Sequence, residues 1–236
     1  MLIKNLAIIP ARSGSKGLVN KNILQIGGKS LIEIACENAE KSENIDKIFF
    51  SSDSKEYINL YKKLNLSKDV SHEYMRPEEI SGDNSTVYEY VYDCINFLKN
   101  IDISVENIII LQVTSPLRTK KHIDTAFEIY NKSLKNSLVS VSECINHPSH
   151  IIIEKNVGEY VRIVDCELGN RQNYKKSYCL NGSIYIVNCS KYISEQKLNI
   201  EKSDIYIMGK IYGIDIDDNI DYEIAKNIFH YYADLC

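Results

Sequence analysis

The chain has 236 residues, of which 44% are hydrophobic and 25% charged, as expected for a globular protein with one large α/β domain. Its formal net charge of −4 argues against a surface that binds nucleic acid or an anionic membrane. Seven cysteines are scattered without a C-x-x-C pair, which favours reduced thiols in a cytoplasmic protein over disulfides or a zinc site. Apolar runs are too short for a membrane span or a signal peptide.

The first part of the chain alternates between strand and helix patterns. Short apolar runs predict strands over residues 6–9, 47–52, 107–112 and 138–141. Amphipathic patterns predict helices over residues 30–41, 55–64, 85–99 and 120–134. Ser30 and Glu33 have the spacing of a capping box at the start of the first helix. This alternation predicts an α/β fold with a mostly parallel sheet and helices on both faces.

The rhythm changes near His147. Residues 151–163 read as a hairpin that turns near 156–158, and a polar stretch follows over residues 165–176. Strands are then predicted over residues 183–187, 206–208 and 211–214, and a last helix over 221–232 with Asp221 as its cap. We therefore predict a single domain, residues 1–236, with an inserted arm at about 147–185.

The loop from Pro10 to Asn22 has a composition that suits a polyphosphate. It combines two glycines, two hydroxyls and three cations: Gly14, Gly17, Ser13, Ser15, Arg12, Lys16 and Lys21. Glycines let the backbone approach a ligand, while hydroxyls, backbone N–H groups and cations bind its oxygens. The loop matches neither G-x-G-x-x-G nor a Walker motif. A basic surface turn is the alternative.

Three polar segments follow predicted strands: residues 10–22, 51–54 and 112–118. The carboxyl ends of parallel strands meet at one edge of a sheet, so these segments should converge there. Asp215 and Asp217 form a further candidate site, because residues two apart on a strand face the same side. Their carboxylates repel each other unless a cation lies between them, and Mg²⁺ suits one or two carboxylates plus phosphate oxygens. A solvated acidic loop is the alternative.

Residues Ile9 to Gly17, Ile-Pro-Ala-Arg-Ser-Gly-Ser-Lys-Gly, followed by Lys21-Asn22, closely resemble the signature loop of the acylneuraminate cytidylyltransferases, also called CMP-sialic acid synthetases. Three later blocks are similar to further motifs of this family: Leu111-Gln-Val-Thr-Ser-Pro-Leu-Arg118, Asn181-Gly-Ser-Ile-Tyr185 and Ile214-Asp-Ile-Asp217. The resemblance covers residues 6 to about 225. It departs from the family at Val113, which stands in place of a proline, and at Cys179-Leu180, where a basic residue is common.

The resemblance implies a Rossmann-like nucleotidyltransferase fold with a dimerisation arm. It implies transfer of CMP from CTP to a sialic-acid-like nonulosonate, with release of pyrophosphate, in a homodimer that uses Mg²⁺ or, in its place, Mn²⁺. The implied nucleotide-binding residues are Ala11, Arg12, Ser15, Lys16, Lys21, Asn22, Arg76 and Ser85. The implied acceptor-binding residues are Gln112, Arg171, Gln172, Asn181 and Tyr185. The implied catalytic residues are Arg12, Lys21 and Asp217, and the implied metal ligands are Asp215 and Asp217.

Alternatives to this function stay open at this point. A Kdo-type or other sugar nucleotidyltransferase would share the fold, although the Kdo enzymes have Ser-Thr-Arg where this chain has Gly-Ser-Lys. A non-catalytic nucleotide-binding regulator is the alternative from another class, and the intact acidic pair weighs against it. A surface hairpin on a monomer is the alternative to a dimerisation arm. His150 is a further departure from the family, because sialic-acid enzymes often have Lys at this position. Among nonulosonates, the departures at His150 and Cys179 favour an acceptor less polar than sialic acid, such as legionaminic acid.

Overall fold

The computed structural model describes residues 1–15, 17–164 and 174–232. Within them, six strands form the central sheet in the order β10-β6-β9-β5-β1-β4. Their bounds are β1 Leu2–Pro10, β4 Lys47–Ser51, β5 Ser104–Ile110, β6 Ser137–Glu143, β9 Tyr178–Asn188 and β10 Asp204–Met208. Strand β9 is antiparallel to both neighbours, and the other pairs are parallel. The predicted mostly parallel α/β fold is confirmed.

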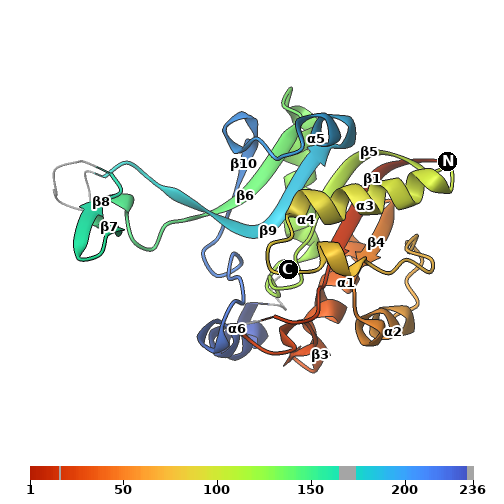
Figure 1. Cartoon of the computed structure of the whole chain (residues 1–236), viewed down its shortest axis with the longest axis horizontal. Helices are drawn as coiled ribbons and strands as arrows, with labels where there is room; N and C mark the ends of the chain where they lie inside the picture. Colours follow the sequence, from red (N-terminus) through yellow and green to blue (C-terminus); the bar gives the residue numbers. More distant parts are fainter. Residues whose placement is uncertain (16, 165–173, 233–236) are drawn as a thin grey trace.

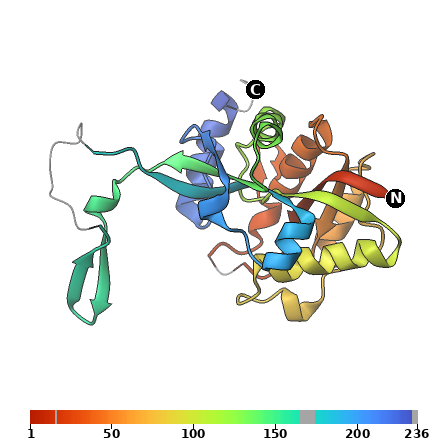
Figure 2. The ribbon, with the colours of Figure 1, turned by 90° about the horizontal axis from the view of Figure 1, so that it is seen from above.

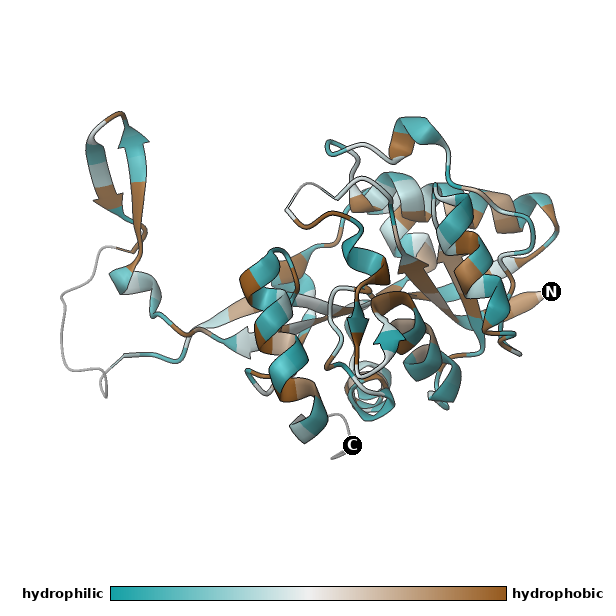
Figure 3. Cartoon of the chain, turned by 90° about the horizontal axis from the view of Figure 1, so that it is seen from below, coloured by the Kyte–Doolittle hydropathy of each residue, from teal (hydrophilic) through white to brown (hydrophobic). Residues whose placement is uncertain are grey.

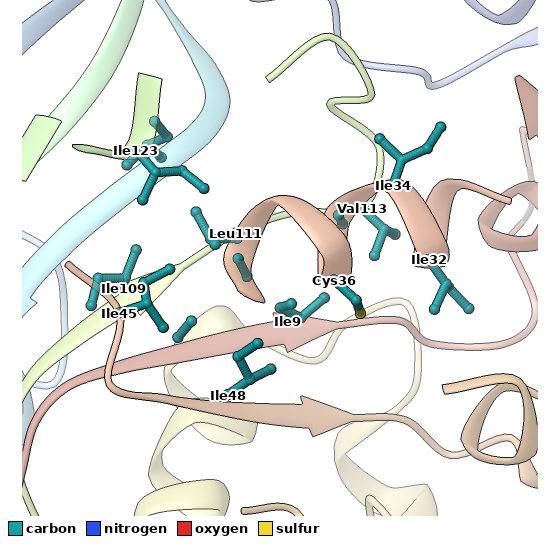
Figure 4. Close-up of a cluster of buried hydrophobic side chains, with 14 of the residues drawn as sticks. Ile9, Ile32, Ile34, Cys36, Ile45, Ile48, Ile109, Leu111, Val113 and Ile123 are labelled. Carbon is teal, nitrogen blue, oxygen red and sulfur yellow. The ribbon is translucent and has the colours of Figure 1, made fainter. Parts of the chain in front are cut away.

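Helices cover both faces of this sheet. On one face lie α1 Leu31–Lys41, α2 Lys55–Lys63, α4 Lys120–Lys132 and α6 Asn219–Tyr232, and on the other α3 Val87–Asn100 and α5 Cys189–Glu195. Because side chains alternate along a strand, Ala7 and Ile9 of β1 enter one core while Leu6 and Ile8 enter the other. Figure 4 shows Cys36 of α1 next to Ile9 in the first core.

Short elements connect these layers. They are η1 Lys21–Ile23, β2 Gln25–Ile26, β3 Lys29–Ser30, η2 Glu78–Ile80, η3 Pro148–His150 and η5 Ile200–Lys202. Strands β2 and β3 pair with each other in a small antiparallel sheet next to α6. In the described part of the chain, no helix is both long and apolar enough to cross a bilayer.

The two predicted helix caps have different outcomes. The capping box of α1 is confirmed: Glu33 N–H donates to Ser30 Oγ at 3.2 Å, and Ser30 N–H donates to Glu33 Oε2 at 2.6 Å. The prediction that Asp221 caps the last helix is wrong. Asp218 Oδ1 accepts from Asp221 N–H at 3.0 Å, and Asp221 Oδ2 accepts from Asp218 N–H at 3.2 Å. Because acids occupy both ends of this reciprocal pair, the sequence alone does not distinguish the cap from its partner.

The strand predicted over residues 211–214 is a turn. Tyr212 N–H donates to Gly209 O at 3.0 Å, and Ile214 N–H donates to Ile211 O at 3.3 Å. Strand β10 ends at Met208, at the carboxyl edge of the sheet, so the chain turns back over that edge. Glycine is needed within the turn, since a Cβ at Gly213 would overlap the hydroxyl of Ser142.

A hairpin stands away from the body on the extended ends of β6 and β9 (Figures 1 and 2). It consists of β7 Ile152–Asn156 and β8 Glu159–Arg162, with Gly158 in the turn at a φ of 78°. This confirms the predicted hairpin and defines the arm. The polar stretch predicted over residues 165–176 lies largely outside the described residues. Strand β9 is longer than predicted, because its first residues pair with β6 to form the neck of the arm.

Candidate active site

Two cavities adjoin at the carboxyl edge of the sheet. The loop cavity, of about 460 Å³, lies beside the loop from Pro10 to Asn22, and the β9 cavity, of about 530 Å³, lies beside the start of β9. Gln112 and Asp217 line both. The nucleotide-binding residues predicted from the sequence that line the loop cavity are Arg12, Ser15, Lys21, Asn22, Arg76 and Ser85. Asn181, Tyr185 and Asp215 line the β9 cavity.

The polar segments after β1, β4 and β5 converge at this edge, as predicted. Asp53, after β4, fixes the loop after β1: its two carboxylate oxygens accept from Ser13 N–H and Ser13 Oγ, each at 2.7 Å. Asn22, which is buried, donates from Nδ2 to Arg12 O at 2.9 Å. Sequence reasoning placed residues 51–54 at this edge but did not identify Asp53 as the residue that holds the loop.

Gly17 brings the loop against the acidic segment. A Cβ on Gly17 would lie 2.5 Å from the backbone oxygen of Asp217, so a larger residue must displace one of the two segments. The sequence predicted a glycine that lets backbone approach a ligand. The structure shows an approach to another part of the chain, which forms one wall of the loop cavity.

The described cations of the loop are paired with carboxylates. Arg12 Nη1 lies 2.9 Å from Asp83 Oδ1, and about a third of each side chain is exposed. Lys21 Nζ donates to Ile216 O at 2.8 Å and to Asp217 Oδ1 at 3.0 Å. Exposed pairs of this kind contribute little stability, so a phosphate can replace the carboxylate partner of Arg12. Lys16 lies outside the described residues.

Arg76 is a buried cation at the wall of the loop cavity. It is 4% exposed, although it directly precedes Pro77 in a segment between helices and strands. Its Nε donates to Ser51 Oγ at 2.9 Å, its Nη2 donates to Ser51 O at 2.8 Å, and its guanidinium lies 4.6 Å from the centre of the Tyr90 ring. These partners are neutral, so the charge of Arg76 adds to the positive potential at the cavity.

Ala11 does not line either cavity. It is buried, and its N–H donates to Ser51 O at 2.9 Å, so it fixes the start of the loop to the end of β4. Ser85 lines the loop cavity just before α3, and its N–H donates to Gly82 O at 3.1 Å.

Asp215 and Asp217 face the β9 cavity although their segment is not a strand. Ile216, between them, is buried in the core and its N–H donates to Thr114 O at 2.9 Å, which turns the two acids the other way. The Asp217 side chain is 80% exposed. Burial raises the pKa of Asp215, the nearby Asp217 carboxylate raises it further, and a hydrogen bond from Thr114 opposes this.

Arg118 lies near Asp215 and is 1% exposed. Its Nη1 donates to Gln112 O and to Ser183 O, both at 2.8 Å, and so joins the end of β5 to β9. Burial lowers its pKa to about 10, while the Asp215 carboxylate acts in the opposite direction. The sequence placed Arg118 in a motif but gave no sign that it is buried and central to the site.

The predicted acceptor-binding residues differ in how firmly their side chains are held by the surrounding structure. The amide of Asn181 is held by β6, because Ser140 Oγ donates to its Oδ1 at 2.6 Å and its Nδ2 donates to Ser142 Oγ at 3.0 Å. Tyr185 is half-buried, and burial followed by the Asp215 charge raises its pKa. Gln112 borders both cavities and is therefore not confined to the acceptor side. Arg171 and Gln172 lie outside the described residues.

Two further residues at the β9 cavity were missed from the sequence. Lys210 is an exposed cation on its wall, in the turn after β10. Gly182, with a φ of 70°, lets β9 approach Asp215: a Cβ there would lie 3.2 Å from Asp215 Oδ2. From the sequence, the Asn-Gly pair could have predicted only a positive φ at Gly182 and not its contact with Asp215.

The carboxylates of Asp215 and Asp217 suit a hard divalent cation that takes its other ligands from the substrate and water. Asp215 Oδ1 is buried and has no hydrogen-bond partner among the described residues. The same residues contain no cluster of three or more side chains of the types that ligate metals. Mg²⁺ commonly uses one or two carboxylates and completes its shell with phosphate oxygens and water, so Asp215 and Asp217 fit it.

Comparison with known proteins identifies the family of the chain. A family model described as cytidylyltransferase matches residues 6–212. The chain is 36% identical to the N-acylneuraminate cytidylyltransferase of Streptococcus agalactiae serotype V, over 98% of this chain and 55% of that one. It is 32% identical to the CMP-N,N'-diacetyllegionaminic acid synthase of Legionella pneumophila, over 94% of this chain and 95% of that one. The chain thus spans about half the length of the streptococcal relative and nearly all of the Legionella one.

The fold is also shared with a solved structure, that of CMP:2-keto-3-deoxy-manno-octonic acid synthetase complexed with CTP. The TM-score is 0.69 at 14% identity, covering 97% of this chain and 99% of that chain, which supports the fold alone. The match over residues 6–212 and the identity above 30% to relatives of the predicted kind confirm the resemblance found in the sequence. The chain belongs to the cytidylyltransferase family.

Proposed function

We propose that the protein is a CTP-dependent cytidylyltransferase that activates a nonulosonate to its CMP-sugar and releases pyrophosphate. The observation that carries this proposal is the pair of adjoining cavities that share Gln112 and Asp217. One cavity carries cations and hydroxyls suited to a triphosphate, and the other carries polar groups suited to a sugar acid. The named activities of the Streptococcus and Legionella relatives support the same assignment.

In this function the anomeric hydroxyl of the acceptor attacks the α-phosphorus of CTP, and pyrophosphate leaves. Arg12 exchanges Asp83 for phosphate oxygens, and Lys21 holds the triphosphate at the junction of the cavities. Asp215 and Asp217 would hold Mg²⁺, or Mn²⁺ in its place, whose charge neutralises phosphate oxygens. Such a transfer depends on positioning and charge neutralisation more than on covalent chemistry.

The acceptor is proposed to be less polar than N-acetylneuraminate, with a legionaminic-type sugar as the first choice. Cys179 and Leu180 line the β9 cavity, where the resemblance to the family implies a basic residue. His150, the other departure, supports this less well: it lies on the arm against Tyr174, 5.6 Å between ring centres, and does not line the cavity. Lys210 is the described cation placed to attract the acceptor carboxylate.

We also propose that the enzyme works in the cytoplasm as a homodimer joined through the arm. The described cysteines, Cys36, Cys94, Cys144, Cys179 and Cys189, are free, which fits a reducing compartment. The arm exposes apolar side chains of both its strands, including Ile152 at 61% and Tyr160 at 61%. Figure 3 shows hydrophobic segments on both strands of the hairpin. Most oligomers are symmetric assemblies of identical chains, so a second copy of this chain is the expected partner to cover these side chains.

The test is pyrophosphate release with CTP, UTP and GTP against N-acetylneuraminate, a legionaminic acid, a pseudaminic acid and Kdo. We expect turnover with CTP and a nonulosonate, and the highest kcat/KM with the legionaminic acid. A preference for N-acetylneuraminate would contradict the acceptor choice alone. Turnover on Kdo with every nonulosonate inert would contradict the assigned cavity. CTP binding without any pyrophosphate release would favour a regulator instead.

A further inference from the structure

Two thiols meet at the neck of the arm, beside the β9 cavity. Cys144 directly follows β6, and Cys179 is in β9. Ser142 pairs with Cys179 in the β6–β9 register, and Cys144 N–H donates to Ser177 O at 2.9 Å. Since side chains alternate along each strand, Cys144 and Cys179 are diagonal neighbours on the same face of this two-stranded neck.

The two sulfur atoms interact. Cys179 Sγ donates to Ser142 O at 3.5 Å, which holds it above β6 on the side of Cys144. Burial raises the pKa of the Cys144 thiol, and the charge and hydrogen bond of the Cys179 thiol raise it further. Cys179 is exposed and Cys144 is half-buried. The exposed thiol is thus placed to react first, with the other positioned directly behind it.

We propose that Cys144 and Cys179 form an oxidative modification site that takes a hydroperoxide and closes to a reversible disulfide. The Cys179 sulfur attacks one peroxide oxygen, the O–O bond breaks, and water leaves with a thiol proton, so that Cys179 becomes a sulfenic acid. The Cys144 sulfur then attacks the Cys179 sulfur, the S–O bond breaks, and a second water leaves with the Cys144 proton. Two thiols lose two electrons in total, and hydrogen peroxide is reduced to two waters.

The other described cysteines lack this arrangement. Cys36, Cys94 and Cys189 are buried, and burial raises the pKa of Cys94 to about 12 and of Cys189 to about 11. Buried thiols in apolar surroundings are inert, whereas reactive ones are accessible. Cys179 also lines the β9 cavity, so any opening that admits the acceptor admits a small hydroperoxide, even with the arm covered by a second copy. This last step rests on the proposed function.

The disulfide would change the acceptor side of the site. It draws the Cys179 side chain from the cavity wall toward Cys144 and removes its hydrogen bond to Ser142 O. It also closes a covalent loop around the whole arm, residues 145–178, and fixes the two strands of its neck. Because Cys179 does not line the loop cavity, we expect a several-fold rise in the KM for the acceptor and no change in the KM for CTP.

The first test is chemical and needs no substrate. The full chain is treated with hydrogen peroxide, its free thiols are alkylated, and a non-reducing digest is read by mass spectrometry. We expect a peptide pair joined through Cys144 and Cys179 that dithiothreitol releases. Cys189→Ser, the matched control, should form the same link. In Cys144→Ser, Cys179 should proceed to sulfinic or sulfonic acid. Over-oxidation of Cys179 in the wild-type chain while Cys144 stays alkylated would overturn the proposal.

The second test is kinetic and uses the acceptor that the first enzyme assay identifies. The wild-type enzyme should show the rise in acceptor KM after peroxide and recover with dithiothreitol, while Cys144→Ser should not recover. A disulfide that forms and leaves both KM values unchanged would overturn its role at the acceptor side. Absence of all nonulosonate turnover would contradict the proposed function instead, and the mass measurement would still decide whether the modification site exists.

Discussion

At the scale of single residues, the site depends on contacts between segments far apart in the chain. Lys21 bonds to Ile216 and Asp217, and Gly17 lies against the Asp217 backbone, almost 200 residues further along the chain. These contacts place a cation, an exposed carboxylate and a close backbone approach at the junction of the two cavities. The activity should therefore respond to changes in any one of them.

Asp217→Asn is expected to lower turnover by at least about 100-fold, because a lost metal contact to phosphate removes several kcal/mol of transition-state stabilisation. The fold should be unaffected, since the side chain is 80% exposed. Pyrophosphate release at saturating Mg²⁺ and thermal unfolding measure the two effects. Glu223→Gln, an exposed acid of α6 outside both cavities, is the control. Near-normal turnover of the Asp217 variant would exclude its role as a metal ligand.

Gly17→Ala is expected to lower kcat/KM for CTP by roughly 10- to 100-fold, because small displacements of binding groups have effects of this size. The new Cβ would lie 2.5 Å from Asp217 O and force the loop from its position. Gly82→Ala is the matched control in the same cavity, since its Cβ would meet nothing nearer than Ser85 Oγ at 3.9 Å. Equal, small effects of both substitutions would show that the loop tolerates the contact.

Tyr185→Phe and Ser85→Ala separate the two cavities. Tyr185 lines the β9 cavity and Ser85 the loop cavity, and neither lines both. Loss of the Tyr185 hydroxyl should raise the KM for the acceptor several-fold with little effect on CTP, and loss of the Ser85 hydroxyl should do the reverse. Steady-state kinetics with each substrate varied in turn is the measurement. If either variant changed both KM values equally, the division between the cavities would be wrong.

At the scale of elements, the sequence predicted strands and helices correctly where the buried residues follow a regular or uninterrupted pattern. The runs around Ile8, Phe49 and Ile109 predicted strands β1, β4 and β5, because a fully buried strand reads as an uninterrupted apolar segment. The turn at residues 211–214 was mistaken for a strand, since a short apolar run with glycines fits both. Whether a charged residue is buried cannot be read from its type, which is why the burial of Arg76 was not predicted and Arg118 was not assigned a role.

Helix α4 carries a histidine whose protonation should affect stability. His122 Nδ1 accepts from Thr119 N–H at 3.1 Å at the start of the helix, and the ring lies 4.5 Å from that of Tyr212. Burial lowers its pKa from 6.5 to about 4, and the charges of Arg118 and Lys121 act in the same direction. The unfolded chain therefore binds this proton at a higher pH than the folded protein, so stability falls as the pH drops from 6.5 toward 4.

His122→Gln should remove this dependence, because the amide keeps an acceptor for Thr119 N–H and does not titrate. Between neutral pH and a pH of about 4.5, the wild type should lose about 2–3 kcal/mol of unfolding free energy more than the variant. Urea unfolding at both pH values gives this difference directly. Parallel losses in the two proteins would show that other groups dominate the acid response.

At the scale of the whole molecule, the arm is the part that the body does not stabilise. A two-stranded hairpin is only marginally stable in water, and this one contacts the body through its neck (Figure 1). Its exposed apolar residues include Ile153 at 46% and Val157 at 102%. The outer strand β10 also exposes Ile205 and Ile207, at 44% and 54%. A partner that covers the arm would supply the apolar burial that a hairpin of this size lacks.

The chain is therefore expected to be a dimer at micromolar concentration, as measured by size-exclusion chromatography with light scattering. Ile152→Asp, in β7, all of whose residues are exposed, should shift the mass toward that of a monomer, because a buried charge at an apolar interface is strongly unfavourable. Leu134→Asp is the control: Leu134 is 102% exposed and lies on the body after α4. A monomeric wild type would reject the dimer, and dimers of both variants would move the interface away from the arm. Because β9 leads from the arm into the β9 cavity, loss of the dimer should also raise the acceptor KM before it affects CTP.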